Sequence, residues 1–202
     1  MICIVQARMS SKRLPGKSLL KLKGKFILER VINNLCLSKK IKKIIVATSN
    51  KKSDNKIVNF CKKNKILFIR GALNNVALRF MKTLKKYPCK SFLRISADSP
   101  LINHKIVDKM IVLSKKKKFD IFTNIFPRTF PRGYSVEIIN TKVFMKYYKN
   151  FNDNQREHIT SYFYEKYKKF IIYNFKSKKN MSHMNFSIDT KKDFLRISKI
   201  VK

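Results

Sequence analysis

The stretch Ile2-Cys-Ile-Val-Gln-Ala-Arg-Met-Ser-Ser-Lys-Arg-Leu-Pro-Gly-Lys17 joins an apolar run to a basic loop. Its first four residues are apolar and partly β-branched, which predicts a buried strand. The loop after them contains Pro15, which stiffens the turn, and Gly16, which allows close backbone approach. A loop between a first strand and a first helix is where α/β proteins hold phosphate groups. The stretch therefore predicts an α/β fold with a ligand-binding loop.

The loop carries side chains suited to a polyphosphate. Three are cationic and two are small hydroxyl donors: Arg8, Arg13, Lys17, Ser10 and Ser11. Lysine offers a point charge and arginine a planar donor fork, and both bind phosphate oxygens. The spacing matches neither G-x-G-x-x-G nor G-x-x-x-x-G-K-[ST], which excludes the common dinucleotide and P-loop motifs. The residues alone leave two interpretations open, a phosphate-binding loop and a solvated basic loop.

Strand and helix patterns alternate after this loop. Short apolar runs predict further buried strands at residues 44–47, 66–69 and 92–95. The segments between them have helical periodicity, with apolar positions from Leu28 to Leu35 in the first helix and Asp54 as the expected cap of the second. This alternation predicts a Rossmann-like, mostly parallel sheet with helices on both faces. Ligands of such sheets bind at the carboxyl ends of the strands.

The pattern changes after residue 125. Alternating residues predict a half-exposed strand at 134–139, in a small antiparallel excursion. A helix is expected at about 155–167, and a strand at 170–175. The T-x-x-D spacing of Thr190 and Asp193 predicts a capping box for a last helix. We expect one domain over 1–202, with a nucleotide-binding half at 1–125 and an acceptor-side half at 126–202 that holds a second metal ligand.

The composition is that of a packed protein with a large positive charge. Its 202 residues are 44% hydrophobic, and 48 Lys and Arg against 11 Asp and Glu give a formal net charge of +37. Such a charge favours a polyanionic partner, including nucleic acid. The lysines are spread along the whole chain, however, and no nucleic-acid-binding motif accompanies them. Compositional drift toward lysine therefore stands beside nucleic-acid binding as an explanation.

The four cysteines form no C-x-x-C pair, and they are interpreted as small buried hydrophobes of a reduced compartment: Cys3, Cys36, Cys61 and Cys89. No basic leader precedes the apolar run at Ile2, and no apolar stretch approaches the roughly 18 residues of a membrane span. A cytoplasmic location without membrane attachment is expected.

Six segments resemble, in order, the motifs of sugar nucleotidyltransferases, in the cytidylyltransferase branch that includes spore coat polysaccharide biosynthesis protein F and the acylneuraminate and 3-deoxy-manno-octulosonate cytidylyltransferases. The segments are 4–17, 45–49, 94–102, 128–133, 156–160 and 188–193. They cover nearly the whole chain, and their ordered combination is more specific than any one of them. The resemblance implies a CTP-dependent enzyme that forms a CMP-activated sugar acid and pyrophosphate for surface polysaccharide or glycan biosynthesis.

The resemblance also assigns roles on the nucleotide side. It implies Asp98 and Asp189 as ligands of Mg²⁺, whereas spacing alone leaves Asp98 open as a turn residue. The catalytic residues are expected to be Arg13, Lys17 and Asp98. The expected nucleotide-binding residues are Gln6, Ala7, Arg8, Ser10, Ser11, Arg13, Gly16, Lys17 and Ser96. Ser96 stands where the octulosonate enzymes have a glutamine resembling a cytosine reader, so cytosine is expected from the resemblance as a whole and not from this residue.

The acceptor side is expected to contain cationic residues, because a sugar acid is an anion. Candidates are Arg132, Glu137, Arg156 and His158. Glu157 is either a further candidate or part of a capping box with Asn154. A histidine in this setting is a general base or, as readily, a packing residue. The expected partners are CTP and a sugar-acid acceptor, with a homodimer suggested by relatives. Alternative functions are a basic nucleic-acid-binding protein on the same fold and a nucleotide-sugar-dependent glycosyltransferase, although the sequence lacks its usual D-x-D motif.

Overall fold

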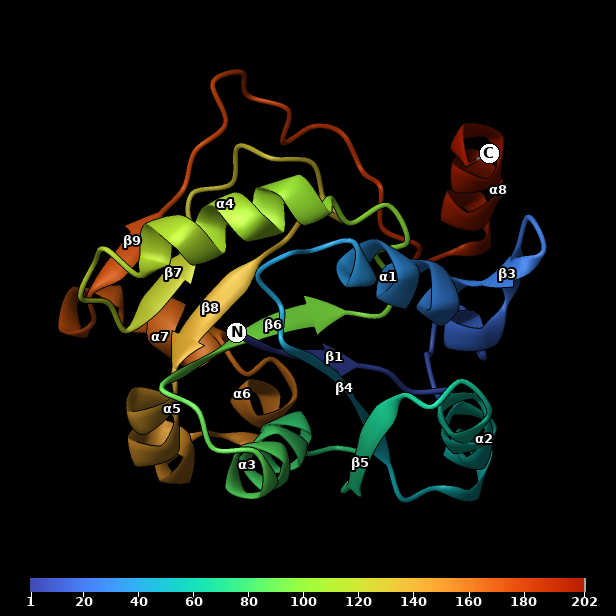
Figure 1. Ribbon diagram of the computed structural model, residues 1–202, viewed down its shortest axis with the longest axis horizontal. Coiled ribbons are helices and arrows are strands. Elements are labelled where there is room, and N and C mark those ends of the chain that lie inside the picture. Colours follow the sequence, from blue (N-terminus) through green and yellow to red (C-terminus); the bar gives the residue numbers. More distant parts are fainter. Residues whose placement is uncertain (202) are drawn as a thin grey trace.

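The computed structural model describes residues 1–201, so Lys202, the last residue of the expected domain, lies outside the described residues. Seven strands form the main sheet: β1 (Ile2–Gln6), β4 (Lys43–Ser49), β5 (Leu67–Gly71), β6 (Ser91–Ser96), β7 (Ile121–Thr123), β8 (Glu137–Asn140) and β9 (Ile172–Asn174). Their spatial order is β5-β4-β1-β6-β8-β7-β9 (Figure 1). Strand β8 runs antiparallel to β6 and β7, and the other neighbours pair in parallel. The expected mostly parallel sheet with an antiparallel excursion is confirmed.

Helices cover both faces of this sheet. They are α1 (Ile27–Cys36), α2 (Asn55–Lys63), α3 (Val76–Lys86), α4 (His104–Ser114), α5 (Thr141–Tyr147), α6 (Asp153–Glu157), α7 (Ser161–Glu165) and α8 (Lys191–Ile200). Figure 1 shows α1 and α4 on one side of the sheet and α3 and α5 on the other. Within residues 1–201, no helix is both long and apolar enough to cross a membrane.

The alternation of side chains along β1 explains the two layers of core. Cys3 and Val5 pack with α1, α2 and α4, whereas Ile4 packs with α3, α5 and α7. Successive residues of a strand point to opposite faces, so a strand that is apolar at every position is buried from both sides. The central strand therefore requires helices above and below it. A short hairpin that the sequence did not reveal, β2 (Lys21–Leu22) and β3 (Lys25–Phe26), precedes α1.

Two expectations for the second half were wrong. Strand β8 is buried rather than half-exposed, because it lies between β6 and β7 and the carboxylate of Glu137 is hydrogen-bonded inside the protein. The helix expected at 155–167 is divided into α6 and α7. Its division comes at Ile159, which is fully buried, and the carbonyl of His158 accepts hydrogen bonds from the backbone and side chain of Ser161. Local bonds of this kind compete with the helical pattern.

Three smaller expectations also failed. Asp54 precedes α2 but makes no capping hydrogen bond. The capping box of α6 joins Asn152 and Gln155 rather than Asn154 and Glu157. Cys36 is exposed because it ends α1, and Cys89 is half-buried, whereas Cys3 and Cys61 are buried as expected. Burial raises the pKa of Cys61 to about 12.

The last helix begins with the predicted capping box. The Asp193 carboxylate accepts hydrogen bonds from the backbone and hydroxyl of Thr190, and from the backbone N–H of Asp189 at 3.1 Å. Burial alone raises the pKa of Asp193, but the hydrogen bonds from Thr190, Arg196 and the backbone outweigh it and lower the pKa below its usual value. The cap therefore fixes both the start of α8 and the backbone of Asp189.

This cap predicts a component of acid unfolding. Because the folded pKa is depressed, the stabilisation by Asp193 is present above its unfolded pKa of about 4 and is lost as the pH falls through the folded value. Asp193→Asn should lower the free energy of unfolding by about 1 kcal/mol at pH 7, and flatten its decline below about pH 4. Urea unfolding at several pH values measures both effects. Asp153→Asn, whose side chain is 97% exposed, is the control. An acid decline equal to that of the unaltered protein would contradict the assignment.

Candidate active site

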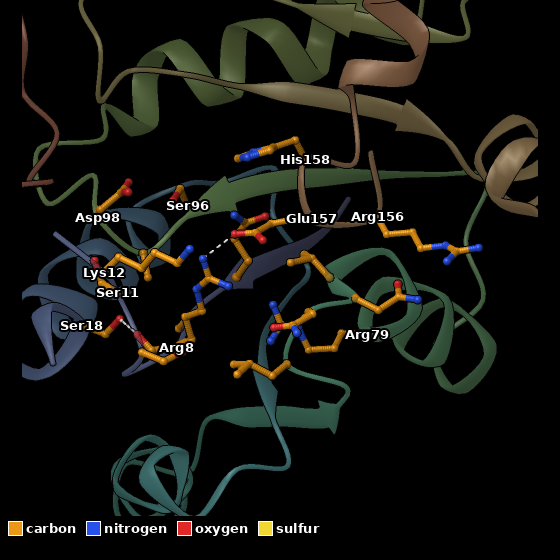
Figure 2. A pocket seen from close by; sticks show the side chains of 18 of the residues that line it. Arg8, Ser11, Lys12, Ser18, Arg79, Ser96, Asp98, Arg156, Glu157 and His158 are labelled. Atoms are coloured by element: carbon orange, nitrogen blue, oxygen red, sulfur yellow. Dashed lines mark hydrogen bonds and ion pairs between the residues drawn. The ribbon is translucent and has the colours of Figure 1, made fainter. Parts of the chain in front are cut away.

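A cavity opens at the carboxyl ends of β1 and β6. Its volume is about 1590 Å³, and its walls come from the loops after β1, β5 and β6, from α6 and from Asp189. Figure 2 shows Asp98, Lys12 and Ser11 on one side and Arg79 on the other. A cavity therefore lies where the sequence predicted ligand binding, at the carboxyl ends of the strands, and residues from both ends of the chain line it.

The loop after β1 is folded back on itself. Gly16 has a φ of +74°, a conformation that favours glycine, and its N–H donates to the carbonyl of Met9 at 2.7 Å. The hydroxyl of Ser18 donates to the carbonyl of Arg8 at 3.0 Å. Gly16 does not line the cavity but closes the turn. The expected nucleotide-binding residues Gln6, Ala7, Arg8, Ser10, Ser11, Arg13, Lys17 and Ser96 do line it.

Asp54 holds this loop against the sheet. Its carboxylate is fully buried and accepts hydrogen bonds from the N–H of Met9 at 2.8 Å, the N–H of Ser49 at 3.0 Å and the hydroxyl of Thr48 at 3.2 Å. The bonds connect the end of β4 to the loop after β1. This role takes the place of the helix cap expected from the sequence, because the carboxylate accepts from β4 and from the loop after β1 rather than from the first turn of α2.

The centre of the charged wall is the Lys17 ammonium. It lies 2.9 Å from a carboxylate oxygen of Asp98 and 2.9 Å from one of Asp189, and donates to the carbonyl of Ile188 at 3.1 Å. Arg13 also pairs with Asp189, at 3.0 Å. Burial alone lowers the pKa of Lys17, but the charges and hydrogen bonds of Asp98 and Asp189 outweigh this and raise it. The structure brings together the four residues expected to hold metal and triphosphate: Arg13, Lys17, Asp98 and Asp189.

The donor set fits a hard divalent cation. A single ammonium already sits between the two carboxylates, at hydrogen-bond distance from each. Within residues 1–201, no group of three or more His, Cys, Asp or Glu side chains is placed to hold a metal by itself. Mg²⁺ is usually held by one or two carboxylates and completes its shell with waters and substrate phosphates. Asp98 and Asp189 are therefore suited to a metal that arrives with a phosphate ligand.

The sequence profile of the cytidylyltransferase family matches residues 2–202. The chain belongs to this family. A cytidylyltransferase from Leptospira borgpetersenii has the same structure, with a TM-score of 0.91 and 32% identity over 96% of this chain and 83% of its own. A CMP:2-keto-3-deoxy-manno-octonic acid synthetase complexed with CTP has a TM-score of 0.74 at 15% identity over 98% of this chain and 97% of its own, which shows the shared fold.

Three relatives extend the comparison by sequence. An uncharacterized protein from Methanocaldococcus jannaschii is 36% identical over 96% of this chain and 79% of its own. The spore coat polysaccharide biosynthesis protein SpsF of Bacillus subtilis is 28% identical over 79% of this chain and 68% of its own. A 3-deoxy-manno-octulosonate cytidylyltransferase from Chlamydia abortus is 26% identical over 54% and 42%.

The acceptor-side candidates of the cytidylyltransferase separate into two groups. Arg156 and His158 line the cavity, and so does Glu157, which pairs with Arg8 across it (Figure 2). Arg132 and Glu137 do not line it. The backbone of Arg132 instead bonds to Met184 and Phe186 of the C-terminal segment.

Glu137 acts at a distance from the cavity. Its carboxylate pairs with Arg94 and accepts a hydrogen bond from the hydroxyl of Tyr164 at 2.6 Å. Arg94 in turn donates to the side chain of Gln6 at 3.1 Å. Burial and then the charge of Glu137 raise the pKa of Tyr164, which keeps the phenol protonated as a donor. Glu137 does not reach the cavity, because β8 lies between β6 and β7. It contacts the site indirectly, since Arg94 joins its carboxylate to the side chain of Gln6.

Sequence reasoning assigned no role in the site to several residues of the cavity wall: Lys12, Ser18, Lys51, Arg79, Asp153, Asn154 and residues 72–76. Most belong to loops whose sequence carries no distinctive pattern. Arg79 had a signal, because it lies on the buried face of α3 among Val76, Phe80 and Leu84. A cation on the apolar side of a helix needs an explanation.

The Asp54 contacts predict a large loss of stability in one substitution. Asp54→Ala leaves buried donors of Met9, Thr48 and Ser49 without an acceptor, and each costs about 1–3 kcal/mol, so the free energy of unfolding should fall by about 3 kcal/mol or more. Denaturant unfolding measures it. Asp108→Ala, which removes a carboxylate that accepts from the more exposed Ser38 and Lys39, is the comparison. Equal losses in the two variants would show that Asp54 is not a buried clamp.

Proposed function

We propose that the cytidylyltransferase transfers the CMP group of CTP to an anionic sugar, a sugar acid, with release of pyrophosphate and dependence on Mg²⁺. The observation that carries the proposal is the Lys17 ammonium between Asp98 and Asp189, beneath a loop with further cations. The product would serve surface polysaccharide or glycan biosynthesis, in the cytoplasm. The names of SpsF and of the octulosonate enzymes support a carbohydrate acceptor.

The nucleotide side would work by positioning and charge. Arg13 and Lys17 hold the triphosphate, and the hydroxyls of Ser10 and Ser11 lie in the same loop. A sugar hydroxyl then attacks the α-phosphate in line with the departing pyrophosphate. Fixed cations around a phosphate lower the barrier because they stabilise the charge of the transition state without having to reorganise.

Asp98 and Asp189 would hold the cation, which neutralises charge on the triphosphate and orients its oxygens. Their carboxylates share the Lys17 ammonium, which would be free to contact the phosphates once the carboxylates hold a metal cation. The backbone N–H of Asp189 donates to Asp193, which would keep the Asp189 backbone in place. The proposal thus assigns to Lys17 a contact with carboxylates in the free protein and with phosphate in the complex.

The acceptor would lie near Arg156 and His158. Arg8 is neutralised by Glu157, and Arg156 pairs with the exposed Asp153. Exposed ion pairs are weak, so Arg156 can exchange Asp153 for a substrate carboxylate at small cost. His158 supplies a side chain of the cavity wall that can accept the proton of the attacking hydroxyl.

A pyrophosphate-release assay tests the proposal. Four nucleoside triphosphates are each combined with sialic, legionaminic, pseudaminic and octulosonic acids in the presence of Mg²⁺, and CTP with one of these acids should give turnover. Asp98→Asn and Asp189→Asn should each reduce it by about 100-fold or more, because each removes a charge that holds the cation. Asp108→Asn, on α4, is the control and should retain full activity.

Two results would oppose the proposal in different ways. Full activity of Asp98→Asn with Mg²⁺ would refute the metal assignment. Absence of pyrophosphate release with every acceptor, together with RNA or DNA binding that weakens steeply with salt, would instead favour the nucleic-acid-binding alternative.

A further inference from the structure

A chain of hydrogen bonds runs along one face of the sheet and ends at the cavity. The hydroxyl of Tyr164 donates to one carboxylate oxygen of Glu137 at 2.6 Å, and the other oxygen pairs with Arg94. The Nε of Arg94 donates to the side-chain oxygen of Gln6 at 3.1 Å. Glu137 is 1% exposed, so the centre of the chain is shielded from water. Of these four residues, Gln6 is the one that lines the cavity.

The direction of the Gln6 amide is fixed by its partner. An arginine has donors and no acceptor, so the atom of Gln6 that faces Arg94 is the amide oxygen. The amide N–H₂ group of Gln6 therefore points the other way. Within residues 1–201 this group has no acceptor and is not enclosed, so it is open to the cavity. The chain thus turns an amide that could rotate into a donor of fixed direction.

The position of Gln6 places this donor on the acceptor side of the site. Gln6 lies opposite Ser96 in the parallel pairing of β1 with β6, so the two side chains are neighbours on one face of the sheet. Ile4 is two residues before Gln6 and therefore on the same face, where it packs with α3, α5 and α7. Helix α6 packs against α3 on this side (Figure 1), and it brings Arg156 to the cavity, with His158 directly after it.

Gln6 and Ser96 are neutral groups that stand next to each other in the cavity wall. Figure 2 shows Ser96 between Asp98 on one side and His158 on the other. Under the proposed function this is the space between the metal and the acceptor. Uncharged donors suit a hydroxyl of the sugar acid, whereas its carboxylate is better matched by a cation such as Arg156.

We propose that Gln6 donates a hydrogen bond from its amide N–H₂ group to a hydroxyl oxygen of the acceptor sugar acid. Arg94, Glu137 and Tyr164 are positioning residues, which act on the acceptor through Gln6. This inference rests on the proposed function, and it moves Gln6 from the nucleotide side, where the sequence placed it, to the acceptor side. A fixed donor makes the site selective, because an acid with an ammonium group at that position would leave the amide unpaired.

A spectroscopic test is possible because the chain contains two glutamines, Gln6 and Gln155. Selective ¹⁵N labelling of glutamine side chains in the full chain gives one pair of amide signals for each. Gln155 is the internal control, because its amide donates to Glu165 and its oxygen accepts from Asn152. Sialic, legionaminic, pseudaminic and octulosonic acids are titrated in turn with Mg²⁺ and CMP, which fills the nucleotide side without turnover. At least one acid should shift the Gln6 signals and leave those of Gln155 in place.

Steady-state kinetics with the same four acids test the donor and its support. Gln6→Leu removes the donor, and Arg94→Met removes the group that fixes it. Each should raise the KM for the acid about 10-fold and leave kcat and the KM for CTP unchanged, because a contact with a hydroxyl that does not react contributes to binding alone. Arg30→Met is the matched control, since the guanidinium of Arg30 donates to carbonyls of the β2–β3 hairpin outside the cavity. It should keep both KM values.

A double variant separates positioning from support of the fold. Arg94→Met alone leaves the buried Glu137 without its cation, so the midpoint of urea unfolding should fall. Arg94→Met combined with Glu137→Leu removes both charges and should regain much of that stability. Its KM for the acid should stay raised, because Gln6 still lacks the donor that orients its amide. A purely structural role of the pair predicts that the KM recovers together with the stability.

The outcomes separate this inference from the proposed function. If an acid gives pyrophosphate release with CTP but shifts neither pair of glutamine signals, the role of Gln6 is refuted and the proposed function stands. Gln6 signals that move with CMP and not with any acid would also refute it, and would return Gln6 to the nucleotide side. If no acid moves these signals and none gives pyrophosphate release, the proposed function fails together with the inference.

Discussion

The ion pairs of Lys17 with Asp98 and Asp189 connect parts of the chain that are 81 and 172 residues apart. Like charges repel, so the ammonium between the two carboxylates stabilises their approach in the free protein. The C-terminal segment that brings Asp189 to the site passes close to Gly133. A Cβ at Gly133 would lie 2.6 Å from the backbone of Phe186, so this close passage requires a glycine.

Acidic residues are few in this chain, and several of them lie at or next to the cavity. The chain has 11 of them against 48 basic residues, and five of those that structure or line the site are Asp54, Asp98, Glu137, Glu157 and Asp189. Each holds a loop or pairs with at least one named cation, and Asp189 pairs with both Arg13 and Lys17. Elsewhere within residues 1–201 no lysine forms an ion pair with a carboxylate. The cations whose geometry is fixed by a carboxylate are therefore few, and most of them line the cavity.

The sequence predicted the parts of the fold that periodicity determines. The apolar run of β1 and the spacing from Leu28 to Leu35 identify their elements, because burial repeats with the geometry of strand and helix. The loop of the site was also predictable, since its residues are contiguous. Periodicity failed for β8, because a polar residue on a buried strand looks the same as one on an exposed strand until its partners, here Arg94 and Tyr164, are known. The helix cap predicted for Asp54 was wrong for a similar reason, because its true partners, Met9 and Thr48, are known only from the folded structure.

Arg79 is an example of a cavity residue whose environment the sequence could not predict. Its position on the apolar face of α3 is visible in the sequence, but its lack of a partner is a property of the folded protein. A fold selected only for stability would replace it with an apolar side chain, because an unpaired buried charge is destabilising. That cost falls on a residue of the cavity wall, where the stability of the free protein and the function of the site are separate requirements. Lys17 is a second cation of the cavity wall, but it differs from Arg79 because Asp98 and Asp189 both pair with it, so its charge is compensated in the free protein.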